Sequence, residues 1–170
     1  MLTQSMIEKA CPIDNESIKK WKNSIFERFI LNNISTRRGK IAEILIEMLL
    51  EKNNISFIRE KDNKSGYDFI INNKKIELKY SSEDKNGNYT FHQVRIEDNR
   101  YDGILFMMIS PKKDEYYYVT KEELKNFTLS IEHSGQSNAC CLSFTKKNSN
   151  LFKQLGNGCF KFAIAKIKNN

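Results

Sequence analysis

The sequence predicts an α/β fold in which a central mixed β-sheet is flanked by helices within a single domain. Three patterns indicate this: short runs that alternate apolar and polar residues, one uninterrupted apolar run, and segments with apolar residues every three or four positions. The uninterrupted run, Gly103 to Ile109, is typical of a strand covered on both faces. Strands and helices in mixed order favour a sheet with helices packed against it.

The first element expected is an amphipathic helix over residues 15 to 33. Polar residues before it offer an N-cap, and its apolar residues recur at helical spacing: Ile18, Trp21, Ile25, Phe26 and Phe29. The position of Trp21 on this stripe predicts a core or dimer contact.

A second helix is expected to begin with Ser35 or Thr36 as its N-cap. One buried stripe is predicted on it from the spacing of Ile41, Ile44, Leu45, Met48 and Leu49. Glu47 and Glu51 are interpreted as solvated. For Glu43, one turn before Glu47, a solvated position and a position beside a polar site are both open.

A hairpin is predicted after a strand at Ile55 to Ile58. Its strands are Phe69 to Ile71 and Ile76 to Tyr80, joined by a turn at residues 72 to 75 whose asparagines tolerate positive φ. Because side chains alternate along a strand, Glu77 and Lys79 share one face, opposite the apolar residues. Folding back at the turn brings Asp68 toward them.

Two carboxylates and one ammonium at one end of a sheet suit metal-assisted chemistry. Mg²⁺ takes one or two protein carboxylates together with waters and phosphate oxygens. A nearby lysine can orient the attacking water or stabilise charge at phosphorus, so Asp68, Glu77 and Lys79 together match the needs of phosphodiester hydrolysis. The alternative is a surface hairpin whose Glu–Lys pair contributes at most about 1 kcal/mol.

Later elements follow from the same patterns. A turn at residues 111 to 114 precedes a strand at Tyr116 to Val119, and Thr120 to Glu123 fits a capping box that opens a short helix. Residues 131 to 138 are expected to form a polar loop. A strand at Cys140 to Thr145 and a short helix around Leu151 to Leu155 are expected after it.

Composition limits the classes of protein that remain. A chain of 170 residues and 20.0 kDa suits one domain, and its formal charge of +7 suits a phosphate-backbone partner, although an AT-rich genome also enriches lysine and asparagine. Four cysteines without CxxC or histidine spacing argue against zinc and predict buried, reduced thiols. With no signal peptide and no long apolar run, we expect a cytoplasmic protein without a membrane span or organic cofactor.

The ordered motifs resemble one nuclease family. Asp68, eight intervening residues and then Glu77-Leu78-Lys79 are similar to the PD-(D/E)XK nuclease superfamily, which includes many type II restriction endonucleases. The helix that carries Glu43 resembles the acidic upstream helix of that family. Phe91 to Arg95, with Gln93, and the strand from Tyr101 to Phe106 resemble two later segments. The resemblance covers residues 37 to about 124, and Tyr67 stands where the family motif has proline.

The resemblance implies a restriction-endonuclease-like sheet and a Mg²⁺-dependent endonuclease that cuts double-stranded DNA as a homodimer. Asp68, Glu77 and the Leu78 carbonyl are then expected to hold Mg²⁺, and Lys79 to orient or activate the water. Glu43 is expected to support the metal site directly or through water, and Gln93 to position either the scissile phosphate or an active-site water. The domain divides into an N-terminal helix at 15–33, a catalytic core at 36–126 and a DNA-recognition region at 127–170.

Candidate DNA contacts fall in three groups. Phosphate contacts are expected near a helix start, from Arg37, Arg38 and Lys40. Beside the glutamine segment, Arg95 and Arg100 could pair with guanine or with phosphate, and base contacts are expected in the polar loop, from His133, Gln136, Ser137 and Asn138. Ordinary surface positions are the alternative, above all for Arg100 and the loop. A repair or junction-resolving nuclease and a non-catalytic DNA-binding module of the same fold also remain open.

Overall fold

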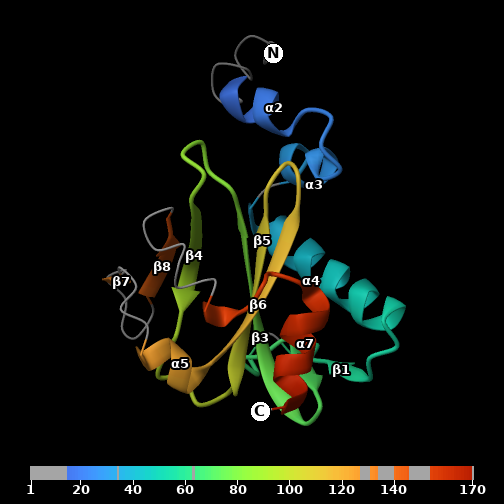
Figure 1. Cartoon of the computed structure of the whole chain (residues 1–170), viewed down its shortest axis with the longest axis vertical. Helices are drawn as coiled ribbons and strands as arrows, with labels where there is room; N and C mark the ends of the chain where they lie inside the picture. Colours follow the sequence, from blue (N-terminus) through green and yellow to red (C-terminus); the bar gives the residue numbers. More distant parts are fainter. Residues whose placement is uncertain are drawn as a thin grey trace, which may run out of the picture.

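The computed structural model describes residues 15–33, 35–62, 64–126, 131–133, 140–145 and 154–169. Its centre is a five-stranded sheet in the order β1-β2-β3-β5-β6 (Figure 1). The strands are β1 (Phe57–Arg59), β2 (Phe69–Ile71), β3 (Lys74–Ser82), β5 (Gly103–Ile109) and β6 (Asp114–Thr120). Only β3 and β5 are parallel, so the sheet is mixed. The predicted α/β class with a helix-flanked central sheet is confirmed.

A second, three-stranded sheet lies against one face of the first. It has the order β4-β8-β7, from β4 (Tyr89–Val94), β8 (Cys140–Phe144) and β7 (Ile131–His133). The predicted loop at 131 to 138 is wrong at its start, because Ile131–His133 pairs with β8 and its backbone groups enter that ladder. The remainder of that predicted loop lies outside the described residues.

Helices cover the opposite face of the central sheet. These are α4 (Ser35–Lys52), α7 (Phe160–Asn169) and two short N-terminal helices, and they share a core with the alternate residues of β3, β5 and β6. The second sheet and α5 (Lys121–Asn126) build a second core on the other face. All seven residues of β5 are buried, as the apolar run predicted.

The single N-terminal helix predicted over 15 to 33 is wrong. The chain forms α2 (Asn15–Trp21) and α3 (Glu27–Leu31), separated by a segment in which Asn23 has φ of 64°. Glu27 accepts a hydrogen bond from the Asn23 backbone N–H at 2.7 Å, and Ser24 accepts one from the Phe26 N–H. These local bonds replace the helical ladder and leave Ile25 84% exposed, whereas Trp21 is buried in the core.

The buried stripe predicted for α4 is also displaced. Ala42, Ile46 and Leu50 are fully buried, while Ile44 and Met48 are 45% and 58% exposed. Apolar residues occupy three of the four rows that run along this helix, so spacing alone left the inner row undecided. Contact with the sheet selects the row at 42, 46 and 50; Ile41, Leu45 and Leu49 flank it, partly buried.

Local chemistry confirms two short predictions. Asn72 and Asn73 both have positive φ, 51° and 61°, as predicted. The turn consists of these two residues rather than of 72 to 75, because Lys74 and Lys75 already pair with β2. Thr120 and Glu123 form the reciprocal capping box: the Glu123 carboxylate accepts the Thr120 N–H at 2.9 Å, and Thr120 Oγ1 accepts the Glu123 N–H at 3.2 Å. The strand predicted at 55 to 58 starts later, at Phe57.

The C-terminal part differs most from expectation. The sequence patterns did not predict α7, which packs on β6 with Phe160, Ile164 and Ile167 buried in the main core. Most of the predicted helix at 151 to 155 lies outside the described residues. Cys141 and Cys159 are free thiols, as expected, but Cys159 is exposed rather than buried. No helix in the described part of the chain is long and apolar enough to span a lipid bilayer.

Candidate active site

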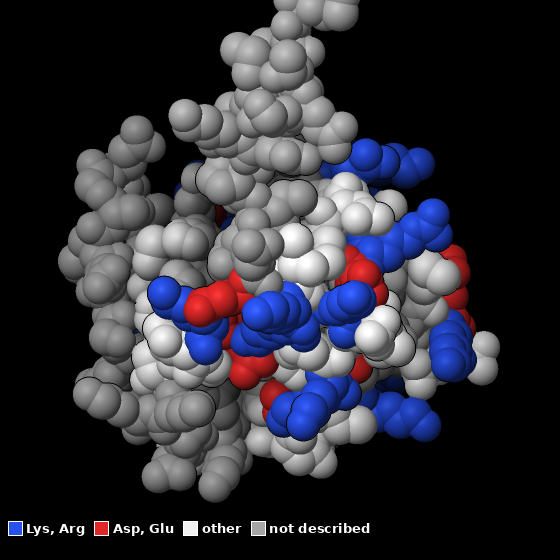
Figure 2. All heavy atoms as spheres, turned by 90° about the horizontal axis from the view of Figure 1, so that it is seen from above, with Lys and Arg blue, Asp and Glu red and all other residues white. Residues whose placement is uncertain are grey.

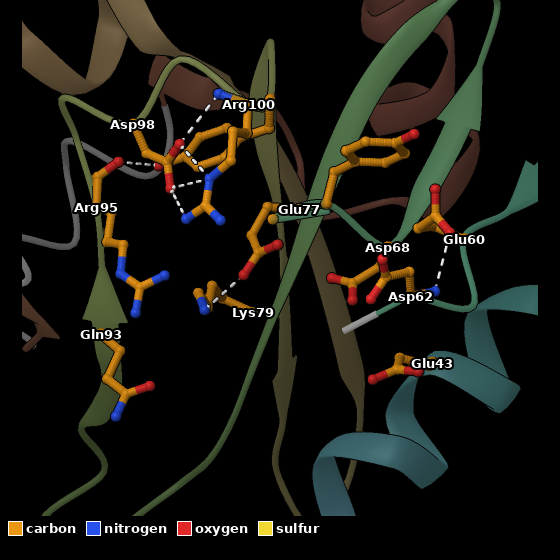
Figure 3. Close-up of a pocket in the computed structure, with 13 residues that line it drawn as sticks. Glu43, Glu60, Asp62, Asp68, Glu77, Lys79, Gln93, Arg95, Asp98 and Arg100 are labelled. Carbon is orange, nitrogen blue, oxygen red and sulfur yellow. Dashed lines mark hydrogen bonds and ion pairs between the residues drawn. The ribbon is translucent and has the colours of Figure 1, made fainter. Parts of the chain in front are cut away.

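The predicted site residues meet in one cleft between the two sheets. The cleft consists of two adjoining cavities of about 280 and 690 Å³ that share Glu43, Asp68, Glu77, Lys79 and Gln93. Figure 3 shows the contributing elements: Glu43 on α4, Asp68 before β2, Glu77 and Lys79 on β3, and Gln93 and Arg95 across the cavity. The β2–β3 hairpin, α4 and β4, which are distant from one another in sequence, therefore supply this cleft, and all five predicted catalytic residues line it.

Asp68 lies directly before the first residue of β2, where the pairing with β3 stops. The β2–β3 pair farthest from the turn is Phe69 with Ile76, so the Leu78 N–H has no strand partner on that side. The Asp68 carboxylate accepts this N–H at 2.7 Å. Because the N–H and C=O of a strand residue point to the same side, the Leu78 carbonyl is directed to the same open edge. Both residues thus present oxygen atoms where the ladder stops.

Burial and neighbouring carboxylates make Asp68 a weak acid in the metal-free protein. Loss of hydration raises its pKa to about 7, and the charge of Glu77 and, less strongly, of Glu43 adds to the rise. The Leu78 N–H and the Lys79 ammonium act in the opposite direction without cancelling it. The carboxylates are therefore close enough to repel one another, a situation that a bound cation relieves.

Glu77 and Lys79 point to the second sheet, as strand alternation predicted. Their strand partners on β5 are Ile104 and Phe106, both in the core between the sheets. The Lys79 ammonium lies 2.7 Å from a Glu77 carboxylate oxygen, and both side chains are about four-fifths buried, at 20% and 18% exposure. The lysine is thus held beside the carboxylates rather than in bulk solvent.

Glu43 reaches the cleft from α4, and one of its partners was not predicted. Arg59 on β1 donates to Glu43 Oε2 at 3.1 Å and to Glu47 Oε2 at 2.5 Å. Burial lowers the pKa of Arg59, but its bonds to the two carboxylates outweigh burial and raise the pKa above its usual range. The prediction that Glu47 is solvated is therefore wrong, because Arg59 binds it. No pattern in the sequence indicated that Arg59 would contact Glu43, because β1 has only three residues and lies at the edge of the sheet.

Gln93 enters the cleft because β4 contains a bulge. Phe91 pairs with Leu142 and Val94 pairs with Cys140, so His92 and Gln93 together oppose Cys141. Gln93 has φ of 55°, and both bulge residues are exposed while Phe91 and Val94 are fully buried. Regular alternation would have placed Gln93 on the buried face with Phe91. His92 Nδ1 lies 3.2 Å from Cys141 Sγ, a neighbour that its sequence position did not reveal.

The two predicted DNA-contacting arginines after β4 differ in their partners. Arg95 is exposed and extends its guanidinium into the cavity beside Gln93 (Figure 3). Arg100 is bound by Asp98 through Nε and Nη2, at 2.9 and 2.5 Å, and also donates to the Lys64 carbonyl. This pairing lowers the pKa of Asp98 to about 2. Arg100 therefore links two loops. Gly66 lies beneath it with φ of 79°, a backbone conformation that favours glycine, and a Cβ there would lie 2.6 Å from Arg100 Nε.

The other predicted DNA-contacting residues are distributed more widely. Arg38 lines the larger cavity at the start of α4, with its Nε donating to the Asn33 carbonyl at 2.7 Å. Arg37 and Lys40 are exposed on α4 outside the cleft. His133 ends β7, and nothing is described of its side chain. Gln136, Ser137 and Asn138 lie outside the described residues.

The oxygen donors suit a hard divalent cation. Asp68 and Glu77 supply carboxylates, and the Leu78 carbonyl adds a neutral oxygen. Among the described residues no group of three or more His, Cys, Asp or Glu could hold a metal alone. Mg²⁺ takes one or two protein carboxylates and completes its shell with water and phosphate oxygens, so Asp68 and Glu77 are of the kind and number that it uses.

Besides Asp98, which binds Arg100, the carboxylates of Glu60 and Asp62 line the narrower cavity and are engaged locally. Glu60 accepts the N–H groups of Lys61 and Asp62 at 2.8 and 2.9 Å, and Asp62 accepts that of Lys64 at 2.9 Å. These bonds shape the loop that precedes Asp68. Sequence patterns had not placed either residue in the cleft.

Comparisons with known proteins do not identify a family. No protein-family model matches the sequence, and no curated protein matches it. Among solved structures, a bacterial homing endonuclease is similar, with a TM-score of 0.46 and 13% sequence identity over 81% of this chain and 99% of that one. The functional interpretation of this chain therefore rests on the residues of the cleft.

Proposed function

We propose that this chain is a Mg²⁺-dependent endonuclease that hydrolyses phosphodiester bonds in double-stranded DNA. The observation that carries the proposal is the meeting of Asp68, Glu77 and Lys79 at one open strand edge inside a cleft. Neither a structural ion pair nor a solvated hairpin requires a second carboxylate with a pKa raised by burial at the same place. Perturbed acids beside an amine in a cleft are typical of a catalytic site.

Each residue has a role that its position supports. Asp68, Glu77 and the Leu78 carbonyl would hold Mg²⁺, which when bound supplies charge stabilisation at phosphorus and a more acidic water. The Lys79 ammonium orients the water and offsets negative charge at phosphorus, and the water gives up a proton to solvent as its oxygen attacks phosphorus. Gln93, across the cavity, donates its amide N–H to a phosphate oxygen. The P–O bond opposite the attacking oxygen breaks, and the leaving oxygen takes a proton from solvent.

Basic residues near the cleft support binding to the DNA backbone. Seen from above, Lys and Arg side chains form a discontinuous band across the described surface, with acidic side chains between them (Figure 2). Arg95 borders the narrower cavity and Arg38 the wider one, so cations stand at both ends of the acidic centre. Phosphates on either side of the scissile bond would meet these arginines.

Sequence-specific cleavage is the finer part of the proposal. The order of Asp68, Glu77, Lys79 and Gln93 supports a type II restriction enzyme of the PD-(D/E)XK superfamily. One chain carries one such site, so cutting both strands of a symmetric target calls for a homodimer. A junction-resolving or repair nuclease would use the same cleft without reading a sequence.

Digestion of a plasmid of known sequence in Mg²⁺ tests the function. Discrete fragments that map to one short sequence are expected. Cutting confined to branched DNA would favour a junction nuclease instead. DNA binding in Ca²⁺ at low salt without cleavage in Mg²⁺ would favour a non-catalytic module. Glu77→Gln should abolish cleavage, with Glu51→Gln, an exposed carboxylate on α4, as the matched control.

A further inference from the structure

Arg59 lies beside the cleft, and the proposed mechanism does not use its contacts. Its guanidinium spans two carboxylates one helical turn apart, with Nη2 on Glu43 and Nη1 on Glu47. Side-chain exposure is 28% for Arg59, 29% for Glu43 and 30% for Glu47. Partly buried, forked pairs of this kind hold a defined geometry better than exposed single contacts.

The backbone places Arg59 next to the metal-binding strand end. Arg59 pairs with Phe69 across the β1–β2 ladder, and the following residue, Glu60, donates its N–H to the Asp68 carbonyl at 2.9 Å. Arg59 therefore joins the acidic helix to the strand pair from which Asp68 projects. Without it, Glu43 and Glu47 would be like charges at i and i+4, which repel.

We propose that Arg59 is a positioning residue for the metal site: it holds the Glu43 carboxylate in place beside Asp68 and offsets part of its charge. Arg59 thereby limits how tightly the site binds a divalent cation while keeping Glu43 in the orientation that cleavage needs. The inference rests on the proposed function, since it assumes that Asp68 and Glu77 hold the cation.

Removing the Arg59 side chain should have opposite effects on the affinity for a divalent cation and on the cleavage rate. Removing the Arg59 charge makes the cleft more negative, so a divalent cation should bind more tightly, by about three- to tenfold. Releasing Glu43 from its fixed orientation should slow cleavage by about tenfold even at saturating metal. A residue that only stabilised the fold would weaken metal binding and cleavage together.

Mn²⁺ binding to the DNA-free protein, followed by electron paramagnetic resonance, provides a readout independent of activity. Arg59→Gln should bind Mn²⁺ more tightly and cleave more slowly. Arg59→Lys keeps the charge but loses the fork, so Mn²⁺ affinity should stay within about twofold while cleavage still falls. Arg28→Gln, which removes an arginine on α3 away from the cleft, should leave Mn²⁺ affinity unchanged. Thermal unfolding of each variant identifies any loss of fold.

The outcomes separate this inference from the function beneath it. Wild-type protein that binds no Mn²⁺ would contradict the proposed metal site, and the role of Arg59 with it. Wild-type protein that binds Mn²⁺ as tightly as a folded Arg59→Gln variant would overturn only the role of Arg59. If Arg59→Gln does not fold, Arg59→Lys decides: cleavage equal to wild type overturns the inference, and slower cleavage at unchanged Mn²⁺ affinity supports it.

Discussion

The two walls of the cleft are built in different ways. The β2–β3 wall is a regular hairpin in which alternation directs Glu77 and Lys79 to the cleft and the end of β2 leaves room for Asp68. The β4 wall depends on a bulge that turns Gln93 out of the buried face at positive φ. The regular hairpin thus positions Asp68, Glu77 and Lys79, whereas the bulge in β4 positions the amide of Gln93. Substitutions in the two walls should therefore differ in their effects on the cleavage rate and on the free energy of unfolding.

The largest effect is expected on the hairpin wall at Lys79. Lys79→Met should lower the cleavage rate by about 10³-fold, or about 4 kcal/mol of transition-state free energy, because the ammonium beside the carboxylates is lost. Single-turnover cleavage in Mg²⁺ measures this. Lys75→Met is the matched control, since Lys75 has the same parity on β3 but is exposed outside the cleft, with its ammonium over the Tyr67 ring. A Lys79→Met enzyme as fast as the control would remove Lys79 from the mechanism.

On the β4 wall, Gln93→Gly should separate activity from stability. Cleavage should fall by about ten- to a hundredfold because the amide is lost. The free energy of unfolding should stay constant or rise by up to about 1 kcal/mol, since glycine tolerates the positive φ. Urea unfolding and single-turnover cleavage measure the two quantities. Loss of stability without loss of activity would show that the bulge serves only the fold.

When no metal is bound, the free energy of unfolding should change with pH mainly because of Asp68 in the hairpin wall. The pKa of Asp68 is about 7 in the folded protein and near its ordinary value, about 3.9, when unfolded, so the unfolded chain releases this proton first as pH rises. Stability from this group is therefore complete below about pH 4 and lost between about pH 4 and 7. Urea unfolding in EDTA at about pH 5 and pH 8 should show a loss of about 1–3 kcal/mol that Asp68→Asn removes. An equal loss in both proteins would assign the pH dependence to other groups.

The smallest effects distinguish the two arginines beside Gln93. Arg95→Gln should weaken DNA binding in Ca²⁺ by about three- to tenfold and lower the salt slope by about one. Arg100→Gln should change DNA binding by less than about twofold, because the Arg100 guanidinium is already paired with the Asp98 carboxylate. Its thermal stability should fall instead. Fluorescence anisotropy at several salt concentrations tests both, and the reverse order of effects would mean that Arg100 leaves Asp98 to contact DNA.

The sequence predicted the two walls of the cleft to different extents. The hairpin wall was predictable, because two asparagines fix the turn and alternation fixes the faces of Glu77 and Lys79. The bulge at Gln93 and the bridge from Arg59 were not, since both depend on the partners of β4 and β1 across the fold. The row of α4 that faces the sheet was predicted wrongly for the same reason: Ile44 and Ile46 are equally apolar, and only packing against the sheet separates them.

Crystals of the protein soaked in Mn²⁺ would test the central claim most directly, through anomalous scattering from the bound ion. The predicted result is a peak within about 2.1 Å of carboxylate oxygens of both Asp68 and Glu77 and close to the Leu78 carbonyl. A peak held instead by Glu60 and Asp62, or no peak in the cleft, would contradict a metal-dependent site at the open edge of β3.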